Sequence, residues 1–333
     1  MKALRTHAVG GPETLTLDII ETPQPDAGTV LVSVKACAIN FPDTLMIRDL
    51  YQFKPARPYA PGGEISGVIE AVGEGVSEWR PGDRVLALTV SGGLAEKVVV
   101  EQSRLFRMPE AVSFETASAL LLTYGTAIHA LSDRGRLEPG DSLLVLGAGG
   151  GVGLAAVELG RALGARVVAA VSSEEKAVAA RAAGAEEVVR YGRDAMDRAQ
   201  SRALAEAFKA ACGPDGAQVV FDAVGGDYSE PALRSIAWEG RFLVVGFPAG
   251  IARLPLNLTL LKSCDVCGVF YGAFVERFPE ANAAHVAELF AMLESGRIAP
   301  RISQLFPLER GGEAIALLQD RKAVGKVVVQ MSS

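Results

Sequence analysis

The chain has 333 residues, of which 49% are hydrophobic and 22% are charged, and its formal net charge is −6. This length fits two domains, and this composition provides a large core without metal or disulfide cross-links. The acidic balance argues against nucleic acid or an anionic membrane as the main partner, because both bind basic surfaces. Without a signal-peptide pattern or an apolar run of about 20 residues, we expect a cytoplasmic protein.

The first 120 or so residues are predicted to be rich in strands and turns. Residues 30–35, 67–72 and 95–100 carry β-branched residues with partial alternation, which is typical of strands. Glycine and proline interrupt this region often, as in the turn at residues 80–83, which leads into a further strand at 84–88.

The middle of the chain alternates between short apolar strands and helices. Residues 143–146 form a continuous apolar run, which indicates a strand buried on both faces of a parallel sheet. Helices are predicted after it and at residues 174–183, the second closed by Gly184. Further strands are predicted at residues 166–171, 188–189, 218–222, 242–246 and 266–270. This alternation predicts a doubly wound α/β domain.

The last 60 residues suggest a return to the first domain. A helix is predicted at 281–295, a strand at 302–306, a helix at 312–319 and a final strand at 326–330. We therefore expect a β-rich domain made of residues 1–122 and 273–333. A cofactor domain of residues 123–272 would be inserted into it, leaving a cleft between the two.

A glycine-rich loop lies between the first buried strand and the helix that follows it. Residues 147–153 read GAGGGVG, and the strand–loop–helix context indicates a dinucleotide site with the pyrophosphate at the helix N-terminus. The fit to G-x-G-x-x-G is imperfect, and a tight turn without a ligand is the alternative. The residues predicted to contact the cofactor here are Gly147, Gly150, Gly151, Val152 and Gly153.

The residues after the second buried strand favour NADPH over NADH. Sites for NAD usually carry an acidic residue about 20 positions after the glycines. Here the strand ends in Ser172 and Ser173, with Lys176 nearby, and these groups can hold a 2′-phosphate. Tyr191, after the third strand, is predicted to lie beside the same phosphate. Two alternatives remain open: Glu174 and Glu175 could turn towards the ribose, and Lys176 could be an ordinary solvated lysine.

Several short motifs occur in an order and at spacings that are specific together. They are residues 10–13 (GGPE), 39–43 (INFPD), 63–68 (GEISGV), 82–85 (GDRV), 123–127 (TYGTA), the glycine loop, 222–226 (DAVGG) and 325–328 (GKVV). With Tyr51 eight residues after Asp43, this series resembles the zinc-free quinone oxidoreductase (zeta-crystallin-like) branch of the medium-chain dehydrogenase/reductase superfamily. The likeness covers nearly the whole chain.

This resemblance implies a GroES-like β-rich domain beside a Rossmann domain that binds NADPH, and a homodimer. It implies an oxidoreductase that reduces quinones or activated carbon–carbon double bonds. It places Asn40, Asp43 and Tyr51 at the nicotinamide end, as the catalytic set. Further cofactor contacts are implied for Thr126, Val224, Gly246, Phe247, Phe270, Tyr271 and Lys326.

The resemblance also implies that no metal is bound. Zinc-dependent relatives hold the catalytic ion with cysteine and histidine, and here the corresponding positions carry Asn40, Gly63 and Ser118. The structural zinc lobe of those relatives is also absent. Cys264 and Cys267 have C-x-x-C spacing, but we interpret them as structural cysteines in a buried strand. Cys37 and Cys212 are interpreted as structural too, as is His129 among the three scattered histidines.

The predicted function is therefore a metal-free transfer of reducing equivalents from NADPH to a quinone, a small-molecule acceptor. The alternative is reduction of an alkenal, an enone or an enoyl thioester, because specificity depends on pocket shape. A third possibility is an NADPH-binding structural or RNA-binding protein, which the acidic charge disfavours. Tyr51 or Asn40 would donate to the oxygen that gains charge, whereas Asp43 would orient its neighbours. Packing of a loop is the alternative for Tyr51.

Overall fold

A computed structural model describes residues 1–331, which divide into two compact units. Unit 1 contains Met1–Leu122 and the chain from Pro300 onward, and unit 2 contains Thr123–Ala299. The sequence analysis assigned residues 273–299 to the first domain, and the structure differs: α10 (Pro279–Glu294) packs with α9 (Tyr271–Arg277) inside unit 2. An amphipathic helix can cover either domain, so its pattern alone did not decide this assignment.

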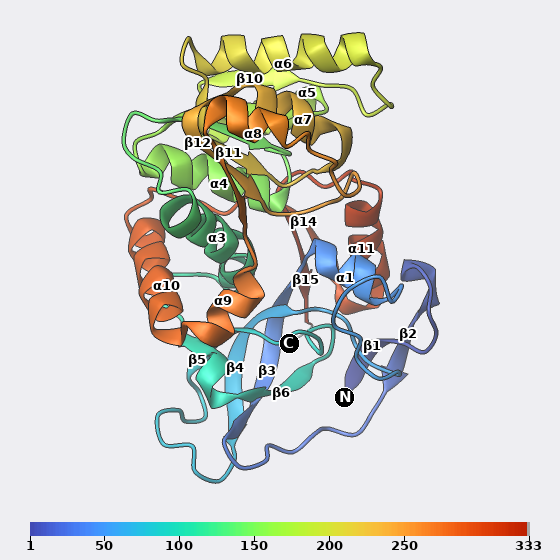
Figure 1. Ribbon diagram of the computed structural model, residues 1–333. Coiled ribbons are helices and arrows are strands. Elements are labelled where there is room, and N and C mark those ends of the chain that lie inside the picture. Colours follow the sequence, from blue (N-terminus) through green and yellow to red (C-terminus); the bar gives the residue numbers. More distant parts are fainter. Residues whose placement is uncertain (332–333) are drawn as a thin grey trace. The chain divides into compact units, whose positions relative to one another are not determined.

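Unit 1 is built on a seven-stranded sheet, in which six strands follow the order β14-β15-β3-β4-β5-β7 and the seventh, β6, pairs with β3. In Figure 1 the last strand, β15, runs beside β3 from the beginning of the chain, as their antiparallel register requires. The pairing shows that the C-terminal segment completes the β-rich unit. The strands are β1 (Lys2–Thr6), β2 (Leu15–Ile19), β3 (Thr29–Ile39), β4 (Glu64–Val72), β5 (Arg84–Leu88), β6 (Lys97–Glu101), β7 (Leu105–Arg107), β14 (Ile302–Pro307) and β15 (Lys326–Gln330).

Short helices close the ends of the unit 1 sheet, whose alternate residues form the core. Ile39, Ile65 and Val327 are at most 1% exposed and share one apolar cluster. Such burial of β-branched side chains is a main source of stability for a β-rich unit. The helices are α1 (Phe41–Met46), α2 (Phe114–Ser118) and α11 (Gly311–Gln319), with 3-10 turns η1 (Pro12–Thr14), η2 (Gln102–Arg104) and η5 (Leu308–Arg310).

Unit 2 contains a six-stranded parallel sheet with the order β10-β9-β8-β11-β12-β13. This order reverses direction between β9–β10 and β11–β13, so the sheet is doubly wound, as predicted. The strands are β8 (Ser142–Leu146), β9 (Arg166–Val171), β10 (Glu187–Arg190), β11 (Ala217–Asp222), β12 (Ile236–Val244) and β13 (Asp265–Gly268). The predicted strand at 266–270 is the edge strand β13, and Val266 is 42% exposed instead of buried.

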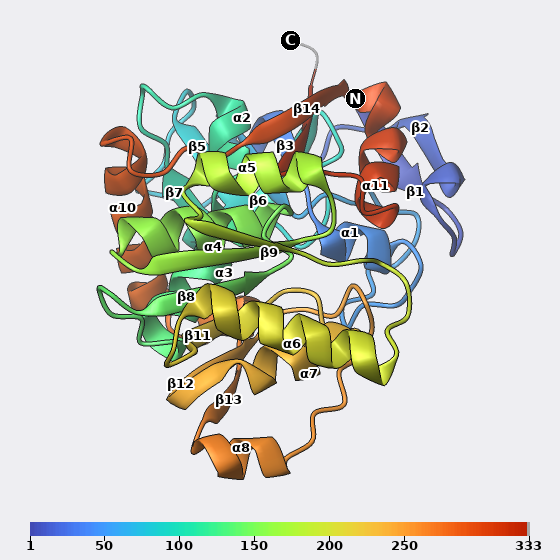
Figure 2. The ribbon, with the colours of Figure 1, turned by 90° about the horizontal axis from the view of Figure 1, so that it is seen from above.

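Helices cover both faces of the unit 2 sheet. The pair α4 and α5 packs together, as does the pair α6 and α7, and Figure 2 shows the two pairs on opposite sides of the strands. The helices are α3 (Leu121–Ile128), which begins in unit 1, α4 (Gly151–Ala162), α5 (Glu174–Ala183), α6 (Arg198–Cys212), α7 (Ser229–Arg234), α8 (Asn257–Lys262), α9 and α10, with the π-helix η3 (His129–Arg134) and the turn η4 (Gly226–Tyr228). Helix α6 was missed by the sequence analysis, although Asp197 and Gln200 form a capping box at its start.

Candidate functional site

The loop between β8 and α4 is shaped by its glycines. Gly147 takes a left-handed φ of 72°, and Gly150 caps α4 in an extended conformation. A Cβ atom on Gly153 would lie 2.1 Å from the carbonyl oxygen of Gly147, so only glycine fits there. Gly151 and Val152 form the first turn of α4, whose leading N–H groups lack partners within the helix. The loop and this turn together form a site suited to an anion.

Lys176 packs directly against this loop. A Cβ atom on Gly149 would lie 2.5–2.9 Å from the Cβ, Cγ and Cδ atoms of Lys176, so the lysine stem covers Gly149. The structure thus brings Lys176, which was predicted to bind a 2′-phosphate, next to the loop predicted to bind the pyrophosphate.

Two serines and an arginine meet where β9 ends. Ser173 caps α5, with its Oγ accepting the Lys176 backbone N–H at 3.3 Å. Ser172 Oγ accepts a hydrogen bond from Arg193 Nε at 3.2 Å. The sequence analysis missed Arg193, although a basic residue two positions after Tyr191 was a signal that could have found it. This end of the sheet therefore presents hydroxyl and guanidinium donors side by side.

Glu174, one of the two acidic residues that could turn towards the ribose, is held by arginines. Glu174 Oε2 lies 2.9 Å from Arg190 Nη1, and its Oε1 lies 3.6 Å from Arg181 Nη1. Glu174 is the first residue of α5, next to the predicted phosphate site. Its carboxylate is thus engaged on the Arg190 and Arg181 side in this structure.

Tyr191 follows β10 and packs its ring against another tyrosine. The Tyr191 and Tyr228 ring centroids lie 4.7 Å apart, and the Tyr228 hydroxyl donates to the Gly192 carbonyl oxygen at 2.8 Å. Burial, with a further contribution from Tyr228, raises the pKa of the Tyr191 phenol. Tyr191 therefore remains protonated at neutral pH and can donate a hydrogen bond.

A buried carboxylate fixes the turn that faces the glycine loop. Asp222 ends β11, is 3% exposed, and accepts the backbone N–H groups of Val224 at 2.9 Å and Gly225 at 2.8 Å. A Cβ atom on Gly147 would lie 2.9 Å from the Val224 side chain, so the two turns touch. Asp222 was missed as a residue that positions Val224. Its place directly after a buried strand was the available signal.

The remaining predicted cofactor residues of unit 2 differ in exposure. Thr126 is half-buried in α3, and Gly246 and Phe247 follow β12, with Phe247 47% exposed. Phe270 is 51% exposed and is the N-cap residue of α9. Tyr271 is different: it is buried, and its hydroxyl donates to Asn282 Oδ1 at 2.7 Å. Its hydroxyl is thus engaged inside unit 2, and its predicted contact with the cofactor stays a prediction.

Unit 1 contains a buried polar cluster of Asn40, Glu64 and Lys326. The Lys326 ammonium donates to Asn40 Oδ1 at 2.6 Å and to Glu64 Oε2 at 2.9 Å. Asn40 Nδ2 donates to Glu64 Oε2 at 2.9 Å and to the Ala38 carbonyl oxygen at 3.3 Å. Glu64 is 0% exposed and Lys326 is 3% exposed.

This cluster bears on two predicted roles. The ammonium of Lys326 donates two hydrogen bonds inside unit 1, and its predicted cofactor contact stays a prediction. Both amide hydrogens of Asn40 are already donated to acceptors, so Asn40 is not free to donate to an electron acceptor. The sequence offered no signal for the cluster, because 286 positions separate Asn40 from Lys326.

Asp43 joins the start of α1 to the segment that precedes β4. Its Oδ2 accepts the Asn40 N–H at 2.8 Å, and its Oδ1 accepts the Gly62 N–H at 3.0 Å. Burial is the largest influence on this group and raises the pKa of the Asp43 carboxyl from an ordinary 3.8 to about 6, although both N–H donors oppose the shift. The carboxyl thus holds the two ends of the segment that carries Tyr51.

The raised pKa of Asp43 predicts a pH-dependent stability. The folded state holds this proton more tightly than the unfolded state, so the stabilisation is complete below about pH 4 and is lost as the pH rises through 6. The loss is about 3 kcal/mol. We expect Asp43→Asn, which cannot ionise, to gain that amount relative to the wild type between pH 4 and pH 7. Urea unfolding of both proteins across this range measures it, and a constant difference would contradict the assignment.

Tyr51 lies in the irregular segment between α1 and β4. It is half-buried, and its ring centroid lies 5.9 Å from that of Phe53. Burial raises the pKa of its phenol, and a hydrogen bond with Gln52 opposes the rise. Tyr51 therefore stays protonated near neutral pH and retains the capacity to act as a donor.

The three positions expected for zinc ligands carry poor donors for that ion. The Asn40 amide is hydrogen-bonded to Ala38, Glu64 and Lys326. Gly63 has no side chain, and the Ser118 hydroxyl donates to the Glu115 carbonyl oxygen at 2.9 Å. Among residues 1–331, histidine, cysteine, aspartate and glutamate form no group of three or more with a metal-binding arrangement. Cys264 is buried and precedes β13, whereas Cys267 lies within this edge strand and is partly exposed.

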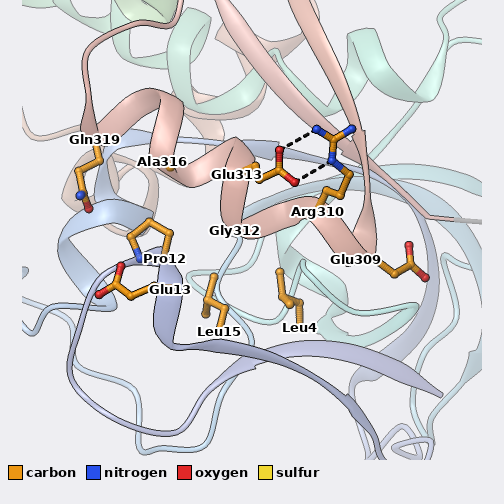
Figure 3. Close-up of a pocket in the computed structure, with 10 residues that line it drawn as sticks. All are labelled: Leu4, Pro12, Glu13, Leu15, Glu309, Arg310, Gly312, Glu313, Ala316 and Gln319. Carbon is orange, nitrogen blue, oxygen red and sulfur yellow. Dashed lines mark hydrogen bonds and ion pairs between the residues drawn. The ribbon is translucent and has the colours of Figure 1, made fainter.

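A hollow of about 420 Å³ lies in unit 1 between η1 and the start of α11, and Figure 3 shows its lining. Arg310 and Glu313 form a two-bonded ion pair on one side of it. None of the predicted catalytic or cofactor residues lines this hollow. Its lining residues are Leu4, Pro12, Glu13, Leu15, Glu309, Arg310, Gly312, Glu313, Ala316 and Gln319.

Two known families match parts of the chain. Residues 26–110 match the family described as "Alcohol dehydrogenase GroES-like domain", and residues 151–287 match "Zinc-binding dehydrogenase". The first match lies in unit 1 and the second in unit 2. In the described part of the chain, no helix has the length and apolar character to cross a membrane.

Individual proteins are similar over nearly the full length. The "Quinone oxidoreductase-like protein 2" of Bos taurus is 38% identical over 313 residues, which cover 93% of this chain and 87% of that protein. The Escherichia coli quinone oxidoreductase, solved as a complex with NADPH, is 29% identical with a TM-score of 0.90, covering 99% of this chain and 100% of that one. The CurK enoyl reductase is 27% identical with a TM-score of 0.86 and covers 99% of each chain.

Proposed function

Because the chain belongs to the quinone oxidoreductase branch of the medium-chain dehydrogenase/reductase superfamily, we propose that it transfers reducing equivalents from NADPH to a quinone without a metal ion. The observation that carries the cofactor part is the set of donors beside the glycine loop of unit 2. Ser172, Lys176 and Arg193 gather where β9 ends, while the carboxylate of Glu174 is engaged by Arg190.

The residues present fit a dinucleotide that carries a 2′-phosphate. A Cβ atom would collide with the Val224 side chain at Gly147 and with the Gly147 carbonyl oxygen at Gly153, so glycine keeps this loop tight against α4. The first N–H groups of α4 suit a pyrophosphate. Lys176, Ser172 and Arg193 would hold the additional phosphate through charge-assisted hydrogen bonds. The Asp222 turn supports the opposite side of the loop through Val224. When bound, NADPH supplies the hydride.

We assign proton donation on the acceptor side to Tyr51. Its phenol is protonated at neutral pH, since burial raises a pKa that is already well above 7. Asn40 and Asp43 act as positioning residues, since their polar atoms are engaged within unit 1. Their contacts hold the segment from which Tyr51 projects.

The proposal that no metal takes part is supported by the chemistry of the donors. Zinc needs thiolate, imidazole or carboxylate ligands, and the three corresponding positions provide an amide, no side chain and a hydroxyl. The Lys326 ammonium also already bonds Asn40 Oδ1 and Glu64 Oε2. The name of the family matched at residues 151–287, "Zinc-binding dehydrogenase", suggests a zinc site, and the residues at these three positions do not fit one.

The acceptor is tested directly with purified, EDTA-treated protein. NADPH and NADH are titrated into the protein while nicotinamide fluorescence is followed. The acceptor, 9,10-phenanthrenequinone or 2-hexenal, is then added to the complex with the nucleotide that binds more tightly. We expect tighter binding of NADPH and oxidation by the quinone. Faster turnover of 2-hexenal would favour the double-bond reductase reading, which the likeness to an enoyl reductase supports. Binding without oxidation of either acceptor would overturn the enzymatic proposal.

Replacing Tyr51 with phenylalanine tests its role as the donor. The variant removes only the hydroxyl, so we expect kcat to fall by about 10²-fold while the Kd for NADPH is unchanged. Steady-state kinetics and fluorescence titration measure the two quantities. Phe53→Leu, a change in the ring that packs beside Tyr51, is the matched control for loop packing. Unchanged kcat in Tyr51→Phe would exclude the residue as the donor.

We further propose that the chain forms a homodimer through the β13 edge of unit 2. An unpaired edge strand with exposed apolar neighbours is a surface that proteins normally cover. A second copy can cover it by pairing the same edge about a twofold axis. The exposed apolar residues in this part of the sequence are Phe247, Ile251, Leu256, Leu260, Leu261, Val266, Phe270 and Phe278.

Leu260→Glu tests the homodimer. Leu260 lies on α8 and is 78% exposed, so a charge there is harmless in a monomer but costly in an apolar interface. We expect light scattering to report the mass of a dimer for the wild type and of a monomer for the variant. Val178→Glu, on α5 and 59% exposed, is the control that should remain dimeric. A monomeric wild type would refute the proposed interface.

A further inference from the structure

The tip of β9 in unit 2 presents two opposing charges to a bound nucleotide. Ser172 and Lys176 favour a 2′-phosphate, but Glu174, the first residue of α5, lies between them in the sequence. A carboxylate about 20 residues after the glycine loop is the group that binds the ribose 2′-hydroxyl in NAD sites. The same carboxylate would repel a phosphate. Selection of NADPH therefore requires that Glu174 be held away from the ribose.

Strand pairing places an arginine where it can do this. Arg190 is the last residue of β10 and pairs with Val171, the last residue of β9. The Glu174 carboxylate, three residues beyond Val171, lies 2.9 Å from Arg190 Nη1. Arg181, two turns along α5, reaches the other carboxylate oxygen at 3.6 Å. The shorter contact comes from Arg190, and the parallel register fixes its position beside β9.

The next basic residue along the chain makes a different contact. Arg193 donates to Ser172 Oγ, a hydroxyl that we assign to the phosphate. Arg190 instead contacts the acidic residue. The two arginines near Tyr191 therefore have different partners. Arg193 bonds a hydroxyl assigned to the phosphate, and Arg190 bonds the carboxylate that would compete with the phosphate.

We propose that Arg190 is a positioning residue that strengthens the preference for NADPH over NADH by holding the Glu174 carboxylate. This proposal rests on the proposed NADPH site and adds a residue that does not touch the cofactor. The ion pair is exposed, with both side chains at 61%. Exposed pairs are weak, so the expected effect on the preference is about three- to fivefold.

The test is a double-mutant cycle read as a ratio of affinities. Arg190→Gln, Glu174→Gln and the double variant are titrated with NADPH and with NADH by nicotinamide fluorescence. We expect Arg190→Gln to lower the NADPH preference about three- to fivefold. In the Glu174→Gln background, Arg190→Gln should have no further effect, because the carboxylate is gone. A general loss of stability would not change the ratio of NADPH to NADH affinity only when Glu174 is present.

Arg234→Gln is the matched control. It removes the exposed Arg234–Glu230 ion pair on α7, so the net charge changes equally while Glu174 is untouched. Its preference for NADPH should equal that of the wild type. If Arg234→Gln lowered the NADPH preference as much as Arg190→Gln, the change in net charge would explain the effect, and the proposal would be overturned.

Other outcomes separate this inference from the proposed function. An equal effect of Arg190→Gln with and without Glu174 would mean that Arg190 acts on the phosphate directly, and no effect would mean that it plays no part; both overturn the positioning role. A wild type that prefers NADH, or that binds neither nucleotide, overturns the inference together with the cofactor assignment. A wild type that binds NADPH but reduces no acceptor leaves the inference testable and refutes only the enzymatic function.

Discussion

Replacing Gly153 with alanine is expected to abolish tight NADPH binding and to destabilise unit 2. The new Cβ would lie 2.1 Å from the Gly147 carbonyl oxygen and 2.8 Å from Ala148 Cα. These are backbone atoms of the glycine loop, so the clash can be relieved only by moving the loop from α4. We expect a loss of about 1–3 kcal/mol in the free energy of unfolding and at least a tenfold rise in the Kd for NADPH.

Gly150→Ala is the matched control for Gly153→Ala. Its φ of −89° suits any residue, and the nearest atom to a new Cβ is 3.6 Å away. The fold should therefore lose less than about 1 kcal/mol, which is the cost of a poorer helix cap. Any loss of NADPH affinity in Gly150→Ala would report the approach of the pyrophosphate itself. Wild-type affinity and stability in Gly153→Ala would contradict the loop geometry.

The second large effect is expected for Lys326→Met. Methionine retains most of the apolar stem but removes the ammonium that bonds Asn40 and Glu64. It leaves the Glu64 carboxylate, 0% exposed, without its cation. Breaking a buried ion pair from one side costs about 3–5 kcal/mol. For a unit of this size we expect the Tm to fall by about 10 °C, which differential scanning calorimetry measures.

A double variant separates charge from packing at this cluster. In Lys326→Met/Glu64→Gln the uncompensated charge is gone, so we expect most of the lost stability to return. The single variant Glu64→Gln gives the fourth corner of the cycle. If Lys326→Met costs no more than about 1 kcal/mol, or if the double variant is no better than the single one, the ion pair is not what stabilises the cluster.

The family motifs and the alternation of strands and helices were sufficient to predict a GroES-like unit and a doubly wound sheet. The family assignment and the fold class are confirmed by the matched families and by the likeness to quinone oxidoreductases. Strand β9 and helix α5 were predicted with their observed bounds. The reason is local: a buried parallel strand is an apolar run, and Gly184 with a φ of 112° ends α5.

The site was predictable only where the chemistry is local in sequence. Two consecutive strand–turn–helix segments, β8–α4 and β9–α5, carry the glycine loop, Ser172, Ser173 and Lys176. Their proximity therefore follows from the βαβ pattern. Their roles towards NADPH remain proposals. Tyr271 shows the limit, because nothing local in its sequence predicts that the packing of α9 on α10 buries the side chain against Asn282.

The sequence by itself determined the family, the fold class and the position of the glycine loop, because each depends on residues that are neighbours along the chain. Tertiary structure alone decided which charges meet. Lys326 reaches Asn40 and Glu64 only because β15 pairs with β3 and β3 pairs with β4. Arg190 reaches Glu174 only through the register of β10 on β9. Such contacts join side chains that are far apart in sequence, and only the pairing of strands brings them within hydrogen-bonding distance.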